Sequence, residues 1–413
     1  MKTFRFAPGS ARLDVKTPTS RSPILLWATV LMIASSGAFA QNICDGKQRG
    51  TVACLIPNVV STASKALDPN YIYDTTVPTG DSFFVVPLTS SLPLPSPASG
   101  FVHSFSPSGA YVQSSQSFGP ILAERSETIG RNKFFVGFTF QRFVFDKVDG
   151  ISLHDFNSVV PFSSGGKISN NFNLGLEVNQ FTTFATYGVT DRVDVSVGIP
   201  ISTVYAGLTY NGSISTPATG FQPLPLFAAA RVTATGIGDV NLQVKGTAIR
   251  SEHAGLALGV NIRLPTGNEY QALGAGATGI EPFVIASANL GRVSPHINLG
   301  YRRNGESVLS GNVATGVKTH IPSQVPFAAG TDIRMAKRLT LAADVLGLEV
   351  IHGDRPDPVT IVSRHSYHIV NGSAGLKVNP FGKLLFVANV LVPLNDAGMR
   401  SKIVPLIGLS YAF

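Results

Sequence analysis

The sequence predicts an all-β fold, a transmembrane antiparallel up-and-down β-barrel of about twelve strands preceded by an irregular N-terminal segment. Three observations predict this fold. Only 14% of the 413 residues are charged, segments with period-two alternation recur along the chain, and short and long connections alternate between them. A soluble globular protein has roughly 25% charged residues, so much of this protein's surface must be apolar.

The first forty residues have the order of a secretory signal. Basic residues precede an apolar stretch over residues 24–33, and the small-residue motif Ala38-Phe39-Ala40 follows. An apolar stretch of about ten residues is too short for a membrane-spanning helix, which needs about twenty. We therefore expect residues 1–40 to be a signal peptide that is cleaved after Ala40.

The rest of the chain lacks the pattern of helical membrane proteins. No run of about eighteen apolar residues follows the leader. Every backbone polar group must be paired inside a bilayer, and the structure that achieves this without spanning helices is a closed β-barrel. An exported, apolar, glycine-rich chain of this kind is expected in the bacterial outer membrane.

The charge balance does not indicate a nucleic-acid partner. The formal net charge of +8 falls to about +4 when the leader's five basic residues and one acidic residue are removed. The remaining basic residues form no run or stripe, so we expect no nucleic-acid binding.

Residues 41–130 differ in composition from the rest of the chain. They are rich in Pro and Ser and have no sustained period, so we expect an irregular segment that plugs or caps the periplasmic side. A flexible tail is an equally good interpretation. Cys44 and Cys54 are the only cysteines, and an oxidising compartment favours a disulfide between them.

Residues 131–413 show the alternation of barrel strands. In residues 256–264, Leu, Val and Ile occupy the even positions, while Gly259, Asn261 and Arg263 share the other face. The simplest account is that the apolar face contacts lipid and the polar face lines the lumen. Residues 193–201, 240–245 and 295–302 divide in the same way.

Twelve strands can be counted, an even number, as expected for a bacterial barrel. They are 133–145, 171–189, 193–208, 236–249, 255–265, 280–291, 294–303, 325–335, 338–351, 366–378, 383–393 and 402–413. The links between them are alternately short and long, which predicts periplasmic turns and outer loops and places both termini in the periplasm. In the second strand the apolar positions change from even to odd, so we expect a bulge near Asn179 and Gln180.

Three motifs resemble a known family. They are Tyr187-Gly188-Val189-Thr190-Asp191-Arg192-Val193-Asp194-Val195, Gly236-Ile237-Gly238-Asp239-Val240 and Leu264-Pro265-Thr266-Gly267-Asn268. They resemble the outer-membrane family described as a putative meta-pathway phenol-degradation transporter, over about residues 133–413. The resemblance implies passage of hydrophobic or aromatic compounds and transfers no binding residues.

The polar face of the predicted strands supplies the candidate lumen-lining residues. They are Asp194, Asp239, Lys245, Asn261, Arg263, His296, Asn298, Arg302, Asp332, Arg334, Asp344 and Lys377. These side chains would either line a water-filled pore or form structural pairs that fill a narrow barrel, and both interpretations stay open. Their mixed signs argue against strong selectivity for ions of one charge.

The pattern favours a monomeric passive channel for small hydrophobic or aromatic solutes, with no metal and no cofactor. A structural or surface-interaction barrel with a closed lumen is the alternative. A third candidate is an outer-membrane lipid hydrolase, which would use a lipid-facing Ser and His. Only His368 could supply that histidine on the clear strands, so we expect no enzyme activity.

The last predicted strand carries an assembly signal. Leu409, Tyr411 and Phe413 lie on one face of residues 402–413. This pattern resembles the terminal signal read by the outer-membrane barrel assembly machinery. That machinery, outer-membrane lipid and the solute are therefore the expected partners.

Overall fold

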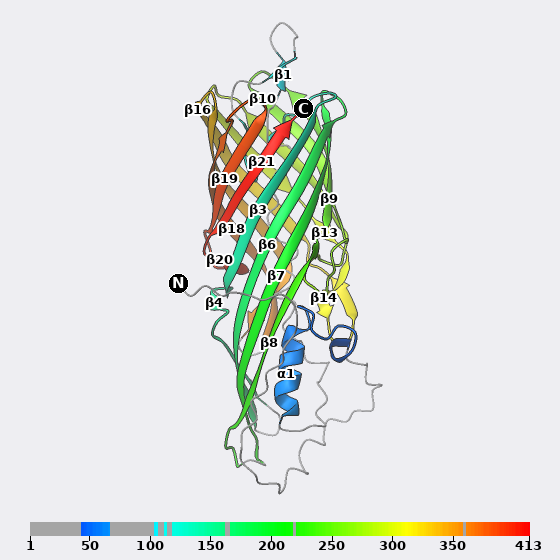
Figure 1. The fold of residues 1–413 in the computed structure, drawn as a ribbon, viewed down its shortest axis with the longest axis vertical. Helices are drawn as coiled ribbons and strands as arrows, with labels where there is room; N and C mark the ends of the chain where they lie inside the picture. Colours follow the sequence, from blue (N-terminus) through cyan, green and yellow to red (C-terminus); the bar gives the residue numbers. More distant parts are fainter. Residues whose placement is uncertain are drawn as a thin grey trace.

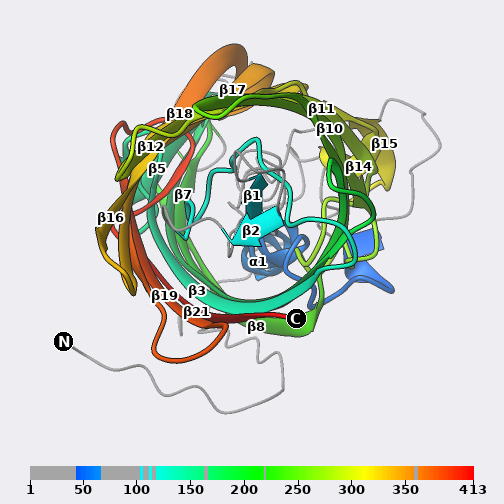
Figure 2. The ribbon, with the colours of Figure 1, turned by 90° about the horizontal axis from the view of Figure 1, so that it is seen from above.

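The computed structural model describes residues 43–66, 103–105, 111–113, 118–161, 166–217, 220–357 and 361–413. These residues form a closed antiparallel barrel of twelve strands, which confirms the predicted fold (Figures 1 and 2). The predicted signal peptide, residues 1–40, lies outside the described residues.

Each strand of the barrel wall pairs antiparallel with the next strand in the chain, and three of the strands are interrupted. The strands are β3 (Phe134–Val148), β6 (Lys167–Gly188), β7 (Val193–Ser215), β8 (Leu224–Ile237) continued by β9 (Val240–Arg250), β10 (Ala254–Leu264), β11 (Gly279–Ala288), β12 (Val293–Gly300) continued by β13 (Arg303–Asn304), β16 (Gln324–Ala336), β17 (Leu339–Asp357), β18 (Ile361–Val378), β19 (Leu384–Pro393), and β20 (Met399–Ser401) continued by β21 (Val404–Ala412). Pairing of β21 with β3 closes the ring, for example Leu409 opposite Phe138.

The smaller elements lie at the ends of the barrel or inside it. They are η1 (Ile43–Asp45), α1 (Leu55–Lys65), β1 (His103–Phe105), β2 (Tyr111–Gln113), β4 (Ile151–Ser152), β5 (Phe156–Pro161), β14 (Glu306–Asn312) and β15 (Val317–His320). Among the described residues, no helix has both the length and the hydropathy needed to cross a membrane.

The two faces of the wall differ as the alternation predicts. Apolar side chains such as Leu258, Ile297 and Leu409 are about half exposed on the outside, whereas Lys245 and Asp332 are buried inside. On β7 the apolar outward positions run from 193 to 201, close to the roughly ten residues that cross an outer membrane in one strand. The outside of the barrel is therefore an apolar belt that suits contact with lipid.

The predicted bulge in β6 is wrong. Its pairing with β7 runs without a register shift from Lys167 to Gly188. Leu174, Leu176 and Val178 face inward instead, where they join an apolar cluster that includes α1. Their apolar character reflects contact with protein inside the barrel and not contact with lipid.

Strands β6, β7 and β8 are longer than predicted. Residues 209–235 were expected to be an outer loop, but β7 continues to Ser215 and β8 begins at Leu224. In this part of the sheet the inner positions are apolar, as at Leu208 and Leu226, and Thr209 faces outward. Beyond the apolar belt the alternation is therefore reversed, with apolar side chains inside the barrel and polar side chains outside. The sheet extends past the belt (Figure 1).

The two ends of the barrel differ. The short turns and Phe413 lie at the upper end in Figure 1, and the long loops lie at the lower end with α1. The expectation that residues 41–130 lie at the short-turn end does not hold for residues 43–66. Helix α1 instead packs at the other end, because the inner faces of β7 and β8 offer an apolar surface to Leu55 and Val59 there.

Candidate functional site

Residues 118–130, which we call the lumen segment, lie inside the barrel just before β3. At the start of the segment the Lys377 ammonium from β18 donates to the carbonyl oxygens of Phe118 and Pro120, at 3.1 and 2.6 Å. The Phe118 amide donates to Thr340 Oγ1 on β17 at 3.1 Å. A cation and a hydroxyl of the wall therefore hold backbone groups of the segment.

The middle of the lumen segment is held by β9. Lys245 Nζ lies 3.1 Å from Glu124 Oε2 and donates to the Arg125 carbonyl at 3.2 Å. Gln243 Nε2 donates to the other oxygen of Glu124 at 2.7 Å, and Thr247 Oγ1 donates to a backbone carbonyl of the segment at 2.6 Å. Lys245 is 1% exposed, so this ion pair is shielded from water and is stronger than a surface pair.

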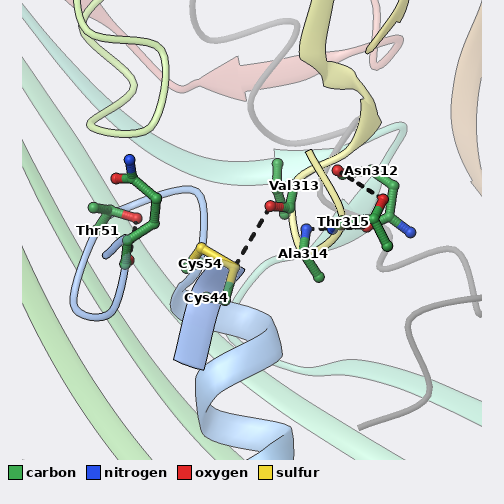
Figure 3. The surroundings of a disulfide bond; sticks show 8 residues. Cys44, Thr51, Cys54, Asn312, Val313, Ala314 and Thr315 are labelled. Atoms are coloured by element: carbon green, nitrogen blue, oxygen red, sulfur yellow. Dashed lines mark hydrogen bonds between the residues drawn. A yellow bond between two sulfur atoms is a disulfide. The ribbon is translucent and has the colours of Figure 1, made fainter. Parts of the chain in front are cut away.

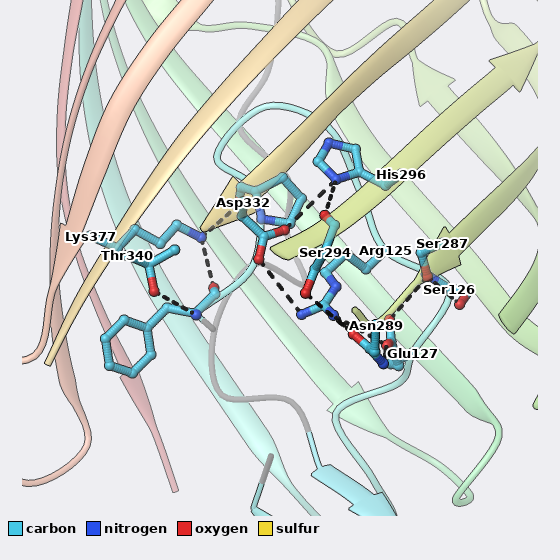
Figure 4. A network of polar contacts seen from close by, with 12 residues as sticks. Arg125, Ser126, Glu127, Ser287, Asn289, Ser294, His296, Asp332, Thr340 and Lys377 are labelled. Atoms are coloured by element: carbon cyan, nitrogen blue, oxygen red, sulfur yellow. Dashed lines mark hydrogen bonds and ion pairs between the residues drawn. The ribbon is translucent and has the colours of Figure 1, made fainter. Parts of the chain in front are cut away.

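Arg125 links the segment to β16 and to the turn after β11 (Figure 4). Its guanidinium donates to Asn289, and it lies 3.9 Å from Asp332 and 3.4 Å from Glu127. Asn289 in turn donates to Glu127 at 3.0 Å. Figure 4 shows this network continuing through Ser294 and His296 across the barrel interior.

His296 lies between two buried carboxylates. Its Nε2 is 2.8 Å from Asp344 and its Nδ1 is 3.7 Å from Asp332, and all three residues are buried. The arrangement fits a satisfied structural histidine. Within the described ranges, no three His, Cys, Asp or Glu side chains gather in a way that could hold a metal ion.

The end of the lumen segment is fixed by Asp194. One of its carboxylate oxygens accepts from the Ile129 amide at 2.9 Å. Asp194 is the second aspartate of the first motif, and it is 1% exposed. The motif therefore positions the chain where it turns into β3.

The second and third motifs are in contact at the break between β8 and β9. Asp239 accepts from the backbone amides of Gly267 and Ala275, at 3.1 and 2.8 Å. Thr266 Oγ1 donates to the Gly238 carbonyl at 2.7 Å and accepts from the amide of Val240 at 2.9 Å. The loop between β10 and β11, residues 265–278, is thus fastened to the break in the wall.

A cavity of about 330 Å³ remains between the lumen segment and loop 265–278. Its apolar lining includes Leu122 of the segment, Leu273 of the loop, and Phe184, Phe283, Ile285 and Leu348 of the wall. Its polar lining includes Gln180, Asn241, Gln243, Asn261, Arg263, Glu281, Asn298 and Arg302. The space therefore offers apolar contact beside a row of amides.

The charged groups at the cavity are paired. Arg263 lies 3.7 Å from Asp239 and donates to Asn304 at 2.8 Å. Arg302 lies 2.6 Å from Glu281. Since each guanidinium has a carboxylate beside it, the cavity presents no excess charge to a solute.

The remaining candidates occupy different positions. Asn261 donates to Glu281 and lines the cavity. With its amide nitrogen turned toward the segment, Asn298 donates to the Glu124 carbonyl and accepts from the Glu124 amide, both at 3.1 Å. Arg334 is half-buried near the short-turn end of β16.

His368, considered as a lipid-facing histidine, does point outward from β18. It lies 3.7 Å from Glu349. Leu409, Tyr411 and Phe413 also face outward, near the short-turn end. Cys44 and Cys54 are joined by a disulfide (Figure 3).

Sequence reasoning missed the partners that the lumen segment supplies, Glu124, Arg125 and Glu127. One signal could have found them. No Asp, Glu, Lys or Arg occurs in residues 82–123, and then five charged residues appear in residues 124–133, directly before the first wall strand, with these three first among them. Charges placed after such a stretch indicate partners inside the barrel.

Comparisons with known proteins add little. A scan against models of protein families found no match, and neither did a search of curated proteins. Among solved structures, the chain is similar to the NanC porin, with 8% identity over 67% of this chain and 98% of that chain and a TM-score of 0.33. It is also similar to a FadL homologue of Pseudomonas aeruginosa (11% identity, 70% and 91% of the two chains, TM-score 0.34). The toluene transporter TbuX of Ralstonia pickettii gives 12% identity, 69% and 90% coverage, and a TM-score of 0.34. Likeness at this level carries no argument, so the proposals below depend on the geometry of the barrel.

Proposed function

We propose that this chain is a passive conduit of the bacterial outer membrane for small hydrophobic or aromatic solutes. The observation that carries the proposal is the cavity of about 330 Å³ lined by the wall, the lumen segment and loop 265–278. Its volume lies at the lower end of the range for small-molecule sites, roughly 300–1,000 Å³. The apolar belt and the closed wall support a location in a lipid bilayer.

The lining supports neutral solutes of mixed polarity. Phe184 and Phe283 supply apolar ring surface, and the carbonyl oxygens of Asn241 and Asn261 accept no hydrogen bond from a described residue. The paired arginines give a charged solute no uncompensated partner, and such a solute would lose its hydration on entry. The turn motifs that resemble a phenol-degradation transporter family agree with this solute class.

Passage would be downhill and would require the lumen segment to shift. The segment crosses the interior between the cavity and the short-turn end, held by Lys377, Lys245 and Asp194. Short turns face the periplasm in outer-membrane barrels, so we assign this end and Phe413 to the periplasm. The barrel would act as a monomer, inserted by the assembly machinery that reads the last strand.

Flux into liposomes tests the proposal. Purified protein in liposomes with a lipopolysaccharide outer leaflet, which slows hydrophobic solutes, should admit toluene and phenol faster than protein-free liposomes of the same composition, and should leave glucose and benzoate flux unchanged. Benzoate matches phenol in size and carries a charge, so it is the control for charge selection. Equal toluene and phenol flux with and without the protein would overturn the proposal.

The lumen segment also favours a second candidate, a structural or surface-interaction barrel with a closed lumen. Buried ion pairs and hydrogen bonds hold the segment along much of its length, as at Glu124 and Arg125. In this case neither aromatic solutes nor sugars would pass. An outer-membrane lipid hydrolase would be recognised by phospholipid hydrolysis that is lost in a His368→Ala variant.

A further inference from the structure

Residues 43–66, which we call the cap, lie at the long-loop end of the barrel (Figure 1). Buried cap residues, among them Cys44, Cys54 and Val59, form one apolar cluster with loop 265–278 and with the segment between β13 and β16. Three parts of the chain that are far apart in sequence thus meet across one mouth of the barrel. The cavity lies on the inner side of loop 265–278, since Ala272 and Leu273 line it.

The cap is attached at two points, and each lies next to a cysteine. The Ile43 amide donates to the Ala314 carbonyl in the β14–β15 turn at 2.7 Å. The Ala53 amide donates to the Tyr270 carbonyl in loop 265–278 at 2.9 Å. The Cys44–Cys54 disulfide joins the two points within the cap and therefore ties the hairpin to the loop.

The disulfide itself is enclosed. Both cysteines are 0% exposed, and the Cys44 sulfur lies 3.8 Å from the Val313 carbonyl oxygen (Figure 3). Helix α1 starts at Leu55, directly after Cys54, and packs on β7 and β8. The bond therefore also connects the β14–β15 hairpin to strands β7 and β8 of the wall.

Loop 265–278 transmits this restraint to the cavity. Tyr270 packs against the cap cluster, while Leu273, three residues later, borders the cavity. At its base the loop is fastened by Asp239 through the amides of Gly267 and Ala275. Outward movement of the middle of the loop must break the Ala53 contact or carry the cap with it.

We propose that the cap is a size filter, in which the Cys44–Cys54 disulfide limits how far loop 265–278 can move and so sets the largest solute that enters from the long-loop end. This inference rests on the proposed conduit function. Solutes that fit the cavity with the loop in place pass the filter. Larger solutes require the loop and the cap to move together, and the bond restricts that movement.

The expected effect follows from the size of the tied loop. The cysteines have a sequence separation of 10. Through loop-closure entropy, loss of a bond that closes a loop of this length raises the ratio of released to docked cap about a hundredfold. Solutes that need the released cap should therefore gain most from loss of the bond. Solutes that already fit should gain little.

The test measures the flux of two neutral aromatics, toluene and the larger pyrene, through the full-length protein in liposomes with a lipopolysaccharide outer leaflet. In the Cys44→Ser/Cys54→Ser variant we expect pyrene flux to rise at least tenfold and toluene flux to change less than twofold. Lys47→Ser, an exposed change in the same loop, should alter neither. The Cys44→Ala/Cys54→Ala variant removes the same bond and keeps an apolar side chain at both buried positions, so it should reproduce the effect even if the serine variant folds poorly.

The outcomes separate the two proposals. Toluene flux no faster than in protein-free liposomes would refute the conduit function. Toluene flux with unchanged pyrene flux, in both the serine and the alanine double variants, would overturn the size filter alone.

Discussion

Lys377→Met tests whether the lumen segment is the barrier on the short-turn side. The ammonium makes two hydrogen bonds to segment carbonyls, at 3.1 and 2.6 Å, and is 0% exposed. A hydrogen bond from a charged donor contributes about 1.5–3 kcal/mol. Burial of the ammonium offsets part of this stabilisation, so we use the lower end of the range, about 3 kcal/mol for the two hydrogen bonds together. Their loss should raise the released fraction of residues 118–120 about a hundredfold.

Planar-bilayer recordings measure this directly. We expect openings of the Lys377→Met protein to be about a hundredfold more frequent than those of wild type. Lys383→Met makes the same chemical change at an exposed position in the next turn and should leave the openings unchanged. If the Lys377 variant is folded by its heat-dependent gel migration and still opens like wild type, the segment is not the barrier.

Three further changes address the wall and its contacts, each measured as the free energy of unfolding in urea. Gly259→Val should cost about 1–3 kcal/mol, because a Cβ there would lie 2.3 Å from the Phe283 ring and 2.5 Å from a backbone oxygen. Ile297→Arg, on the lipid face of β12, should cost about 2–4 kcal/mol. Lys245→Met should cost about 3–5 kcal/mol by leaving a buried carboxylate without its cation, and adding Glu124→Gln should restore most of the loss.

Matched controls make these three predictions refutable. A Cβ at Gly198 on β7 would meet nothing within 4 Å, so Gly198→Val should cost much less than the change at Gly259. Thr209→Arg lies outward beyond the apolar belt and should be nearly neutral. Equal costs within either pair would contradict the assigned contacts, and additive effects at Lys245 and Glu124 would contradict their coupling.

Much of the wall could be predicted from alternation alone. The side-chain period of two fixes which residues share a face, so Asp194 and Lys245 could be placed inside before any partner was known. The faces were mistaken where the interior is filled by protein. Leu174 and Leu176 are apolar because they meet a protein core, and alternation alone does not distinguish such a core from lipid.

The partners of the lumen residues could not be predicted. Lys377 contacts Pro120, which lies 257 positions away in sequence, and no local pattern encodes that pairing. Asp239 and Gly267 stood in separate motifs whose meeting depends on the break between β8 and β9. Residue spacing predicts which face of a strand a side chain occupies, but the three-dimensional fold determines which partner that side chain contacts inside the lumen.

The place of the lumen segment in the chain links its contacts to the closing seam of the barrel. Residues 118–130 run directly into β3, and β3 forms the closing seam with β21. The segment nevertheless contacts strands across the interior, through Lys245 and Lys377. In the folded protein those ammonium groups have acceptors only because the segment is present, and a ring closed without it would leave them to be hydrated by water in the lumen. The residues that fill the barrel and the strand that closes it are therefore one continuous stretch of chain, so the position of the segment is tied to the position of β3 at the seam.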